Sequence, residues 1–292
     1  MFKGSIVAIA TPFHNGKVDE KKLRDLIDFQ IKNGTRGIVP CGTTGESATL
    51  TFDEHEKVIE ITIEQVNKRV PVIAGTGSNS TEEAIMLTRQ AASSGADASL
   101  QVSPYYNRPT QTGLYMHFKA IAQSVKIPII LYNIAGRTGV NIEPETIARL
   151  AKDCKNIVAV KEASGSLDQM SRIKALCPPS FQLISGDDSL TLPVLSIGGI
   201  GIISVVANIV PADVADLVSA FEKGNIKKAQ SLHYKLLPLI KAVFIETNPI
   251  PIKTAMGLLG MCEPGLRLPM CEMSADNLGK LKKALKDYGL LN

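Results

Sequence analysis

Short, nearly continuous apolar runs recur along the chain, and each is followed by a loop and then by an amphipathic stretch. The runs are SIVAIA (5–10), GIVP (37–40), VPVIAG (70–75), DASLQVS (97–103), IPIILYN (127–133), NIVAVKE (156–162), FQLISGD (181–187) and GIGIISV (199–205). Strands that are buried on both faces of a parallel sheet have this composition. The runs begin roughly 20 to 33 residues apart, which is the size of a strand-plus-helix unit. The pattern therefore predicts eight buried parallel strands.

The stretches between these runs carry apolar residues at helical spacing, such as Leu23 and Ile27 in 19–33. The helices predicted after the strands cover 19–33, 53–67, 81–94, 111–124, 143–152, 167–177, 188–197 and 211–223. Ser80 precedes one of these helices and Glu83 follows three residues later, which predicts a capping box.

Eight strands, each followed by a helix, predict an α/β protein of the (β/α)₈ TIM barrel class, which typically needs about 250 residues. An open doubly wound sheet is the alternative, but it would place a glycine-rich fingerprint after the first strand, and none follows residue 10. Three more helices are predicted at 225–246, 250–261 and 275–289. We therefore divide the chain into a barrel, residues 1–223, and a C-terminal helical domain, residues 224–292, packed on it.

Composition narrows the class of protein further. The chain is 45% hydrophobic with a net charge of +4, which excludes disorder as its main state. Its basic residues are scattered, so we expect no nucleic-acid partner. No apolar run approaches the length of a membrane span, and the N-terminus lacks a signal peptide, so we expect no membrane partner either. Five cysteines without a Cys-x-x-Cys motif indicate reduced thiols in the cytoplasm.

Barrel enzymes place their active sites at the carboxyl ends of the strands. In this sequence those ends carry Thr11, GTTGE (42–46), Thr76, Tyr105, Tyr106, Asn107, Tyr132, Asn133, Lys161, Glu162, Gly186, Asp187 and Ser204. The four histidines are dispersed, and no His or carboxylate joins this set at metal-ligand spacing. We therefore expect an enzyme without a catalytic metal.

Lys161 ends the strand NIVAVK, which should lie inside a packed barrel. Burial disfavours the charged form of a lysine, and a neutral amine can attack a ketone to form a Schiff base. The alternative interpretation is a lysine that pairs with Glu162 at the rim of the barrel.

Schiff-base chemistry also needs a proton donor and a seat for the substrate's carboxylate. Tyr132 can supply the proton, and Tyr106 could extend a relay to it through Thr43. The loop 42–45 can form the seat, and Arg137 could bind a second carboxylate. Each feature has a plainer interpretation: a strand-to-helix turn for the loop, packed or interface aromatics for Tyr106 and its neighbour, and a surface position for Arg137.

Six motifs, in this order, resemble the family of 4-hydroxy-tetrahydrodipicolinate synthases, also called dihydrodipicolinate synthases. They are GTTGES (42–47), SPYYNRP (103–109), LYNIAGRTG (131–139), VKEASG (160–165), SGDD (185–188) and NPIPIK (248–253). The resemblance implies a class I Schiff-base lyase, without metal or organic cofactor, that condenses pyruvate with L-aspartate-4-semialdehyde in the diaminopimelate route to lysine. It also implies a homotetramer arranged as a dimer of dimers.

Position by position, the resemblance implies the role of each site residue. Lys161 forms the imine with pyruvate, Tyr132 is the acid/base at that imine, and Thr43 links Tyr132 to Tyr106 of a neighbouring subunit. The implied substrate-binding residues are Thr43 and Thr44 for the pyruvate carboxylate, Arg137 for the semialdehyde carboxylate, and the backbone of Gly186 and Ile203. Ala135 replaces a proline common in the family, and we still expect Arg137 to keep its role.

Members of the family that lysine inhibits bind it at a dimer interface. The matching positions here are Ser47, Ala48, His55, Asn79, Glu83 and Tyr105. Phe52 stands where other members often carry a different ring or a polar group, so the sequence leaves the strength of inhibition open. L-lysine is therefore an expected effector.

Two other functions are compatible with parts of this pattern. A sialic acid or keto-deoxy sugar acid aldolase would share Lys161, Tyr132 and the glycine–threonine loop, but a sugar would need hydroxyl partners in place of Arg137. A non-catalytic barrel that senses lysine or a keto acid would keep the effector residues and lose the relay. Because Lys161, Tyr132, Thr43 and Tyr106 are all present, we favour the synthase.

Overall fold

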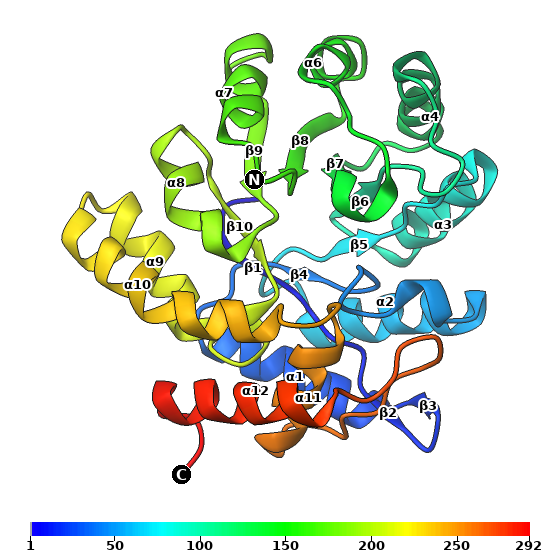
Figure 1. The fold of residues 1–292 in the computed structure, drawn as a ribbon. Coiled ribbons are helices and arrows are strands. Elements are labelled where there is room, and N and C mark those ends of the chain that lie inside the picture. The colour runs from blue at the N-terminus through cyan, green and yellow to red at the C-terminus, as the bar shows by residue number, and fades with distance from the viewer. Residues whose placement is uncertain (1) are drawn as a thin grey trace.

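The computed structural model describes residues 2–292. Eight parallel strands form a ring in the order β4-β1-β10-β9-β8-β7-β6-β5, and helices surround it (Figure 1). A parallel bridge between Ile38 and Val72 joins the two ends of this order. The predicted (β/α)₈ barrel is confirmed.

The strands are β1 (Gly4–Ala8), β2 (Phe13–His14), β3 (Lys17–Val18), β4 (Ile38–Val39), β5 (Ile73–Gly75), β6 (Ala98–Val102), β7 (Ile129–Asn133), β8 (Ile157–Glu162), β9 (Gln182–Ser185) and β10 (Gly201–Ser204). The helices are α1 (Glu20–Lys32), α2 (Phe52–Val66), α3 (Thr81–Ser94), α4 (Gln111–Ser124), α5 (Ala135–Thr138), α6 (Pro144–Asp153), α7 (Leu167–Leu176), α8 (Thr191–Ser196), α9 (Pro211–Glu222), α10 (Ile226–Val243), α11 (Ile250–Leu258) and α12 (Ala275–Tyr288). Short 3₁₀ turns occur at η1 (Ser47–Thr49), η2 (Asp188–Leu190) and η3 (Val206–Asn208).

Side chains of each strand alternate between the inside of the barrel and the surrounding helices, as the pleat requires. In β7, Ile130 and Tyr132 belong to the inner apolar cluster, while Ile129 and Leu131 pack with the helices. The same period in β8 puts Lys161 on the inner face, two residues after the inner Ala159. Strand geometry therefore brings the two candidate catalytic side chains to the interior.

The predicted capping box at α3 is only half correct. The Ser80 hydroxyl accepts from the Glu83 N–H, but the Glu83 carboxylate accepts from the Ser78 hydroxyl at 2.7 Å. The Ser80 N–H also donates to the Ser78 hydroxyl, so Ser78 takes the place of the expected reciprocal bond.

The β2–β3 hairpin, helix α5 and the short turns η1 and η3 were not predicted. The hairpin of β2 and β3 turns at Asn15 and Gly16, both at positive φ, and its strands are too short to show an apolar pattern. Helix α5 has four residues, too few for a helical period. The helix predicted at 188–197 divides into η2 and α8.

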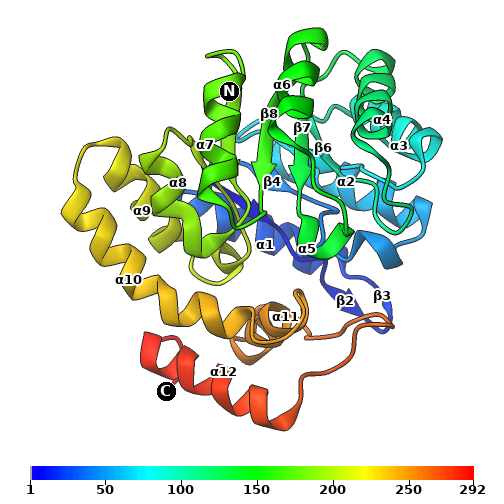
Figure 2. The same cartoon turned by 45° about the horizontal axis from the view of Figure 1, so that its top comes forward.

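The C-terminal helices α10, α11 and α12 lie along one side of the barrel (Figure 2). Leu236 of α10, Ile252 of α11 and Leu285 of α12 belong to one buried cluster with Ile27 of α1 and Val58 of α2. The predicted packing of these helices on the barrel is thus seen, while the division into two domains stays a prediction.

Among residues 2–292, no helix has both the length and the apolar character needed to cross a membrane.

Candidate active site

A cavity of about 830 Å³ lies at the carboxyl ends of the strands. Of the predicted catalytic and substrate-binding residues, Thr43, Tyr132 and Arg137 line it. Of the predicted effector residues, Ser47, Ala48, His55, Glu83 and Tyr105 line it as well. Within one chain, the candidate active site and the candidate effector pocket therefore share a continuous space.

Lys161 and Tyr132 are neighbours across strands β8 and β7, where they are paired in register. The Lys161 Nζ lies 4.1 Å from the centroid of the Tyr132 ring, and both side chains are buried. Glu162 is buried on the opposite face of β8, where its carboxylate accepts from Asn133, Ser164 and Gln169. The alternative pairing of Lys161 with Glu162 is therefore wrong, because adjacent residues of a strand face opposite sides.

The electrostatic surroundings of Lys161 favour its neutral form. Burial lowers the pKa of Lys161 to about 7; the Asp188 carboxylate opposes this shift and the Arg137 guanidinium adds to it. Burial raises the pKa of Tyr132 to about 12, against the opposing effects of a hydrogen bond with Thr43 and of the Arg137 charge. At neutral pH the site thus offers a substantially uncharged amine beside a protonated phenol, which are a nucleophile and a proton donor.

The relative placement of Lys161 and Tyr132 depends on a polar network behind them. Asn133 donates to both oxygens of Glu162, at 3.2 and 3.0 Å, and its own Oδ1 accepts from the N–H of Ile142. This bond joins the residues that follow Tyr132 and Lys161 in β7 and β8. Asn133 and Glu162 stand at predicted strand ends, and the alternation of side chains along a strand could have placed them outside the barrel, but no motif indicates their bond.

Asp188 is a second residue with a role that no sequence pattern indicated. Its carboxylate is buried and accepts from the Ser204 hydroxyl and from the N–H groups of Val205 and Val206. Burial raises the pKa of Asp188, and these hydrogen bonds oppose the shift. Because it limits the fall in the pKa of Lys161, Asp188 helps to set the protonation of the amine. The SGDD motif contained it, but nothing in the local pattern ties it to Lys161.

The loop after β4 holds its two threonines differently. Thr43 lines the cavity, whereas Thr44 is buried and its hydroxyl accepts from the Asn248 side-chain amide at 3.1 Å. Arg137 of α5 is exposed toward the cavity and donates to the Asn248 carbonyl at 3.1 Å. Asn248 therefore links the candidate seats for the two carboxylates.

Gly186 lies beside Lys161, and Ile203 belongs to the inner cluster of the barrel; neither of them, nor Lys161 itself, is among the residues that line the cavity. A Cβ on Gly186 would stand 3.1 Å from the Lys161 Cγ and 2.8 Å from the Ala163 Cβ, so this position needs glycine. Ile203 is fully buried in the inner cluster with Tyr132.

Tyr106 and Asn79, which were also predicted to belong to the site, do not line the cavity either. Tyr106 is 90% exposed, at a φ of 68°, whereas its neighbour Tyr105 lines the cavity. Asn79 only borders this region, where its side-chain amide donates to the Tyr105 carbonyl. A relay through Tyr106 is therefore not assembled within one chain.

In a (β/α)₈ barrel, a buried and readily neutralised lysine beside a buried tyrosine is the arrangement that a lyase working through a Schiff base would need. The model of the dihydrodipicolinate synthetase family matches residues 1–288. The chain is 62% identical over 291 residues to the 4-hydroxy-tetrahydrodipicolinate synthases of Endomicrobium trichonymphae and Syntrophus aciditrophicus (strain SB), with all of each chain covered. The chain belongs to this family, as the sequence motifs predicted.

Solved structures of dihydrodipicolinate synthases are also similar to this chain over almost its whole length. Dihydrodipicolinate synthase from Aquifex aeolicus has a TM-score of 0.98 and 53% identity, with 99% of each chain covered. The enzyme from Cyanidioschyzon merolae, solved with lysine bound, has a TM-score of 0.96 and 44% identity, with 99% of each chain covered. The predicted activity, that of a 4-hydroxy-tetrahydrodipicolinate synthase and hence a lyase, is confirmed by these relatives, which favour it over the aldolase and sensor alternatives.

The pKa of Lys161 predicts how imine formation depends on pH. Since only the neutral amine attacks, the rate of trapping by pyruvate and cyanoborohydride should rise about tenfold per pH unit below a midpoint near pH 7, then level off. Arg137→Gln should move the midpoint upward, because the guanidinium lowers the pKa of Lys161. Mass spectrometry of the reduced adduct measures both rates. A rate that keeps rising to about pH 10, the range of an ordinary lysine, would contradict the assignment.

Proposed function

We propose that Lys161 carries the covalent chemistry by which this chain condenses pyruvate with L-aspartate-4-semialdehyde. The observation that supports this role most directly is the buried amine at the barrel mouth, with its pKa lowered to about 7 and its Nζ 4.1 Å from the centre of the Tyr132 ring. A lysine with this environment is an unusually good nucleophile toward a ketone.

The reaction begins when the Lys161 Nζ bonds to the keto carbon of pyruvate. Tyr132 donates a proton to the resulting hydroxyl, water departs, and an imine remains. The imine accepts electron density, so the pyruvate methyl loses a proton and becomes a nucleophilic enamine carbon. This carbon bonds to the aldehyde carbon of the second substrate, whose oxygen takes up a proton and remains as a hydroxyl group. The amine of that substrate then closes on the imine carbon and displaces the amine of Lys161.

We assign the substrate carboxylates to the two groups of residues that Asn248 connects, the threonines of the loop after β4 and Arg137. Thr43 and Thr44 hold the carboxylate of pyruvate, together with backbone from Gly186 and Ile203. Arg137 holds the carboxylate of the semialdehyde through its planar guanidinium, which suits two parallel hydrogen bonds. The contact of Arg137 with the Asn248 carbonyl orients the guanidinium toward the cavity.

The exposure of Tyr106 supports an oligomer in which the relay is completed between subunits. A tyrosine held at a φ of 68° and 90% exposed has neither a packing role nor a relaxed backbone in one chain. Contact with Thr43 of a second copy would give the side chain a packing role and would offset the cost of this backbone conformation. We propose a homotetramer, a dimer of dimers, whose tight interface supplies Tyr106.

We propose L-lysine as an effector that binds in the outer part of the same cavity. Five of the six expected residues line it, and the Glu83 carboxylate there suits an ammonium group. The relative from Cyanidioschyzon merolae was solved with lysine bound.

We place the reaction in the cytoplasm, in keeping with five cysteines that are all free.

Reduction in the presence of pyruvate tests the nucleophile. Pyruvate with cyanoborohydride should label Lys161 alone, and Lys161→Met should abolish labelling and turnover, whereas Lys228→Met on the surface should change neither. Peptide mass spectrometry locates the label. Label on another lysine would remove Lys161 from the mechanism, and cleavage of a sialic or keto-deoxy sugar acid without condensation would favour the aldolase.

Tyr106→Phe tests the relay, because it removes only the hydroxyl. We expect kcat to fall about 100-fold, in line with the loss of a proton-transfer group, with labelling by pyruvate retained. Tyr234→Phe, another exposed tyrosine, is the control.

A mixture of the two variants tests whether Tyr106 acts across an interface. Refolding Tyr106→Phe together with Lys161→Met should restore about one quarter of the wild-type activity, because half of the random dimers are hybrids and each hybrid has one complete site of two. No restoration would show that Tyr106 does not act across an interface.

Inhibition by L-lysine tests the effector pocket. Lysine at about millimolar concentration should lower turnover, and His55→Ala should weaken inhibition because His55 is buried against the cavity and bonded to the Gly75 carbonyl. His233→Ala, outside the cavity, should leave inhibition unchanged. Turnover that does not respond to lysine would rule out the effector role.

A further inference from the structure

The C-terminal helices make a buried contact with the loop that follows β4. The Lys253 Nζ of α11 lies 2.6 Å from the Glu46 Oε1, with the two side chains 0% and 3% exposed. The Arg267 backbone N–H donates to the other oxygen of Glu46 at 3.1 Å. Both carboxylate oxygens of Glu46 are therefore held by residues more than 200 positions away in sequence.

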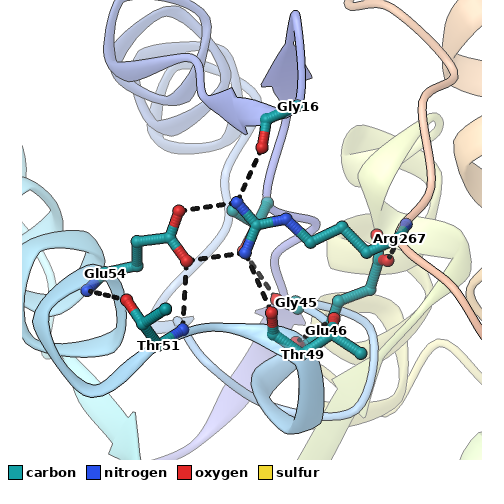
Figure 3. A network of polar contacts seen from close by, with 8 residues as sticks. Gly16, Gly45, Glu46, Thr49, Thr51, Glu54 and Arg267 are labelled. Atoms are coloured by element: carbon teal, nitrogen blue, oxygen red, sulfur yellow. Dashed lines mark hydrogen bonds and ion pairs between the residues drawn. The ribbon is translucent and has the colours of Figure 1, made fainter.

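The Arg267 side chain extends this contact to three further segments (Figure 3). Its two terminal nitrogens each lie 2.6 Å from a Glu54 oxygen, at the start of α2. They also donate to the carbonyls of Thr49 in η1 and Gly16 in the β2–β3 turn, at 2.9 and 2.8 Å. One arginine thus fixes the exit of the loop against the first turn of α2.

The loop itself adopts a conformation that needs such support. Cys41 and Glu46, on either side of the Gly-Thr-Thr-Gly turn, both have a φ of 54°, which is uncommon for residues with a side chain. A Cβ on Gly45 would lie 3.1 Å from the Cys41 nitrogen, so the turn is also tight. Backbone in these regions persists where surrounding contacts determine it, and such segments concentrate at ligand sites.

We infer that Lys253 and Arg267, acting through Glu46, are positioning residues that hold Thr43 and Thr44 in place for the carboxylate of pyruvate, an inference that rests on the proposed function. Neither Lys253 nor Arg267 lines the cavity, whereas Glu46 does, so the two basic residues reach the substrate site through Glu46 and its loop. A buried ion pair is by itself weak evidence for stability, since well-packed neutral residues often serve as well. The role of the Lys253–Glu46 pair is to hold the loop after β4 in a single conformation.

Removing the charges of Lys253 and Glu46, first singly and then together, separates an effect on substrate binding from an effect on folding stability. Lys253→Met and Glu46→Gln each leave one buried charge unpaired, so each single variant should unfold at a lower temperature and raise the KM for pyruvate at least tenfold. The double variant removes both charges. We expect its thermal unfolding to return toward that of the wild type while its KM for pyruvate remains at least fivefold raised, with saturating pyruvate still labelling Lys161 completely.

Arg267→Lys offers a milder test, because a lysine keeps the charge and the backbone N–H but loses the two-pronged contact with Glu54. Its KM for pyruvate should rise less than in Lys253→Met, with kcat nearly unchanged. Lys228→Met, which breaks an exposed ion pair with Asp216, is the matched control and should alter neither constant.

The outcomes distinguish this inference from the proposed function. If the wild type is not labelled by pyruvate and cyanoborohydride, the proposed function fails and the inference with it. If the wild type is labelled and the double variant has a wild-type KM for pyruvate, the positioning role alone is refuted, because stability would then account for the whole effect of the single variants.

Discussion

The chemistry proposed for this barrel depends on keeping the amine of Lys161 out of water. Its pKa is about 7 in the folded chain against 10.5 for an ordinary lysine, so the unfolded chain binds a proton more readily between these values. Folding stability from this group is therefore lost as pH falls from about 10.5 to about 7, and the deficit is constant below that range. At neutral pH the cost is on the order of 4 kcal/mol, which the rest of the fold must offset.

That constraint explains why the inner and outer faces of β7 and β8 differ. Tyr132 and Lys161 face the interior, where little hydrogen bonding competes for the amine, while Asn133 and Glu162 form a dense polar network outside. A slip of one residue in either strand would exchange the two pairs. The buried network behind the site thus specifies the register on which the neutral amine depends.

The barrel was predictable because its signals are local: continuous apolar runs, helical periods and their spacing. Lys161, Tyr132 and Thr43 could be named because strand ends and family motifs mark them. Asp188 and Asn248 could not be assigned roles, since their partners Ser204 and Thr44 are distant in sequence and no periodicity connects them. The cavity shared by active site and effector residues likewise arises only from folding.

The contacts of the C-terminal helices could not be predicted from local sequence patterns either. These contacts show why the helices belong to the same functional unit as the barrel. In sequence they appear as an appendage, yet Asn248, two residues before the start of α11, bonds to Thr44 and Arg137, and α11 buries Lys253 against Glu46. A barrel mouth is built from loops, which are the least rigid part of the fold. Because α10 to α12 share the apolar cluster of α1 and α2, they give these loops a rigid backing that the strands alone cannot supply. The loop proposed to hold pyruvate is therefore anchored from both ends of the chain.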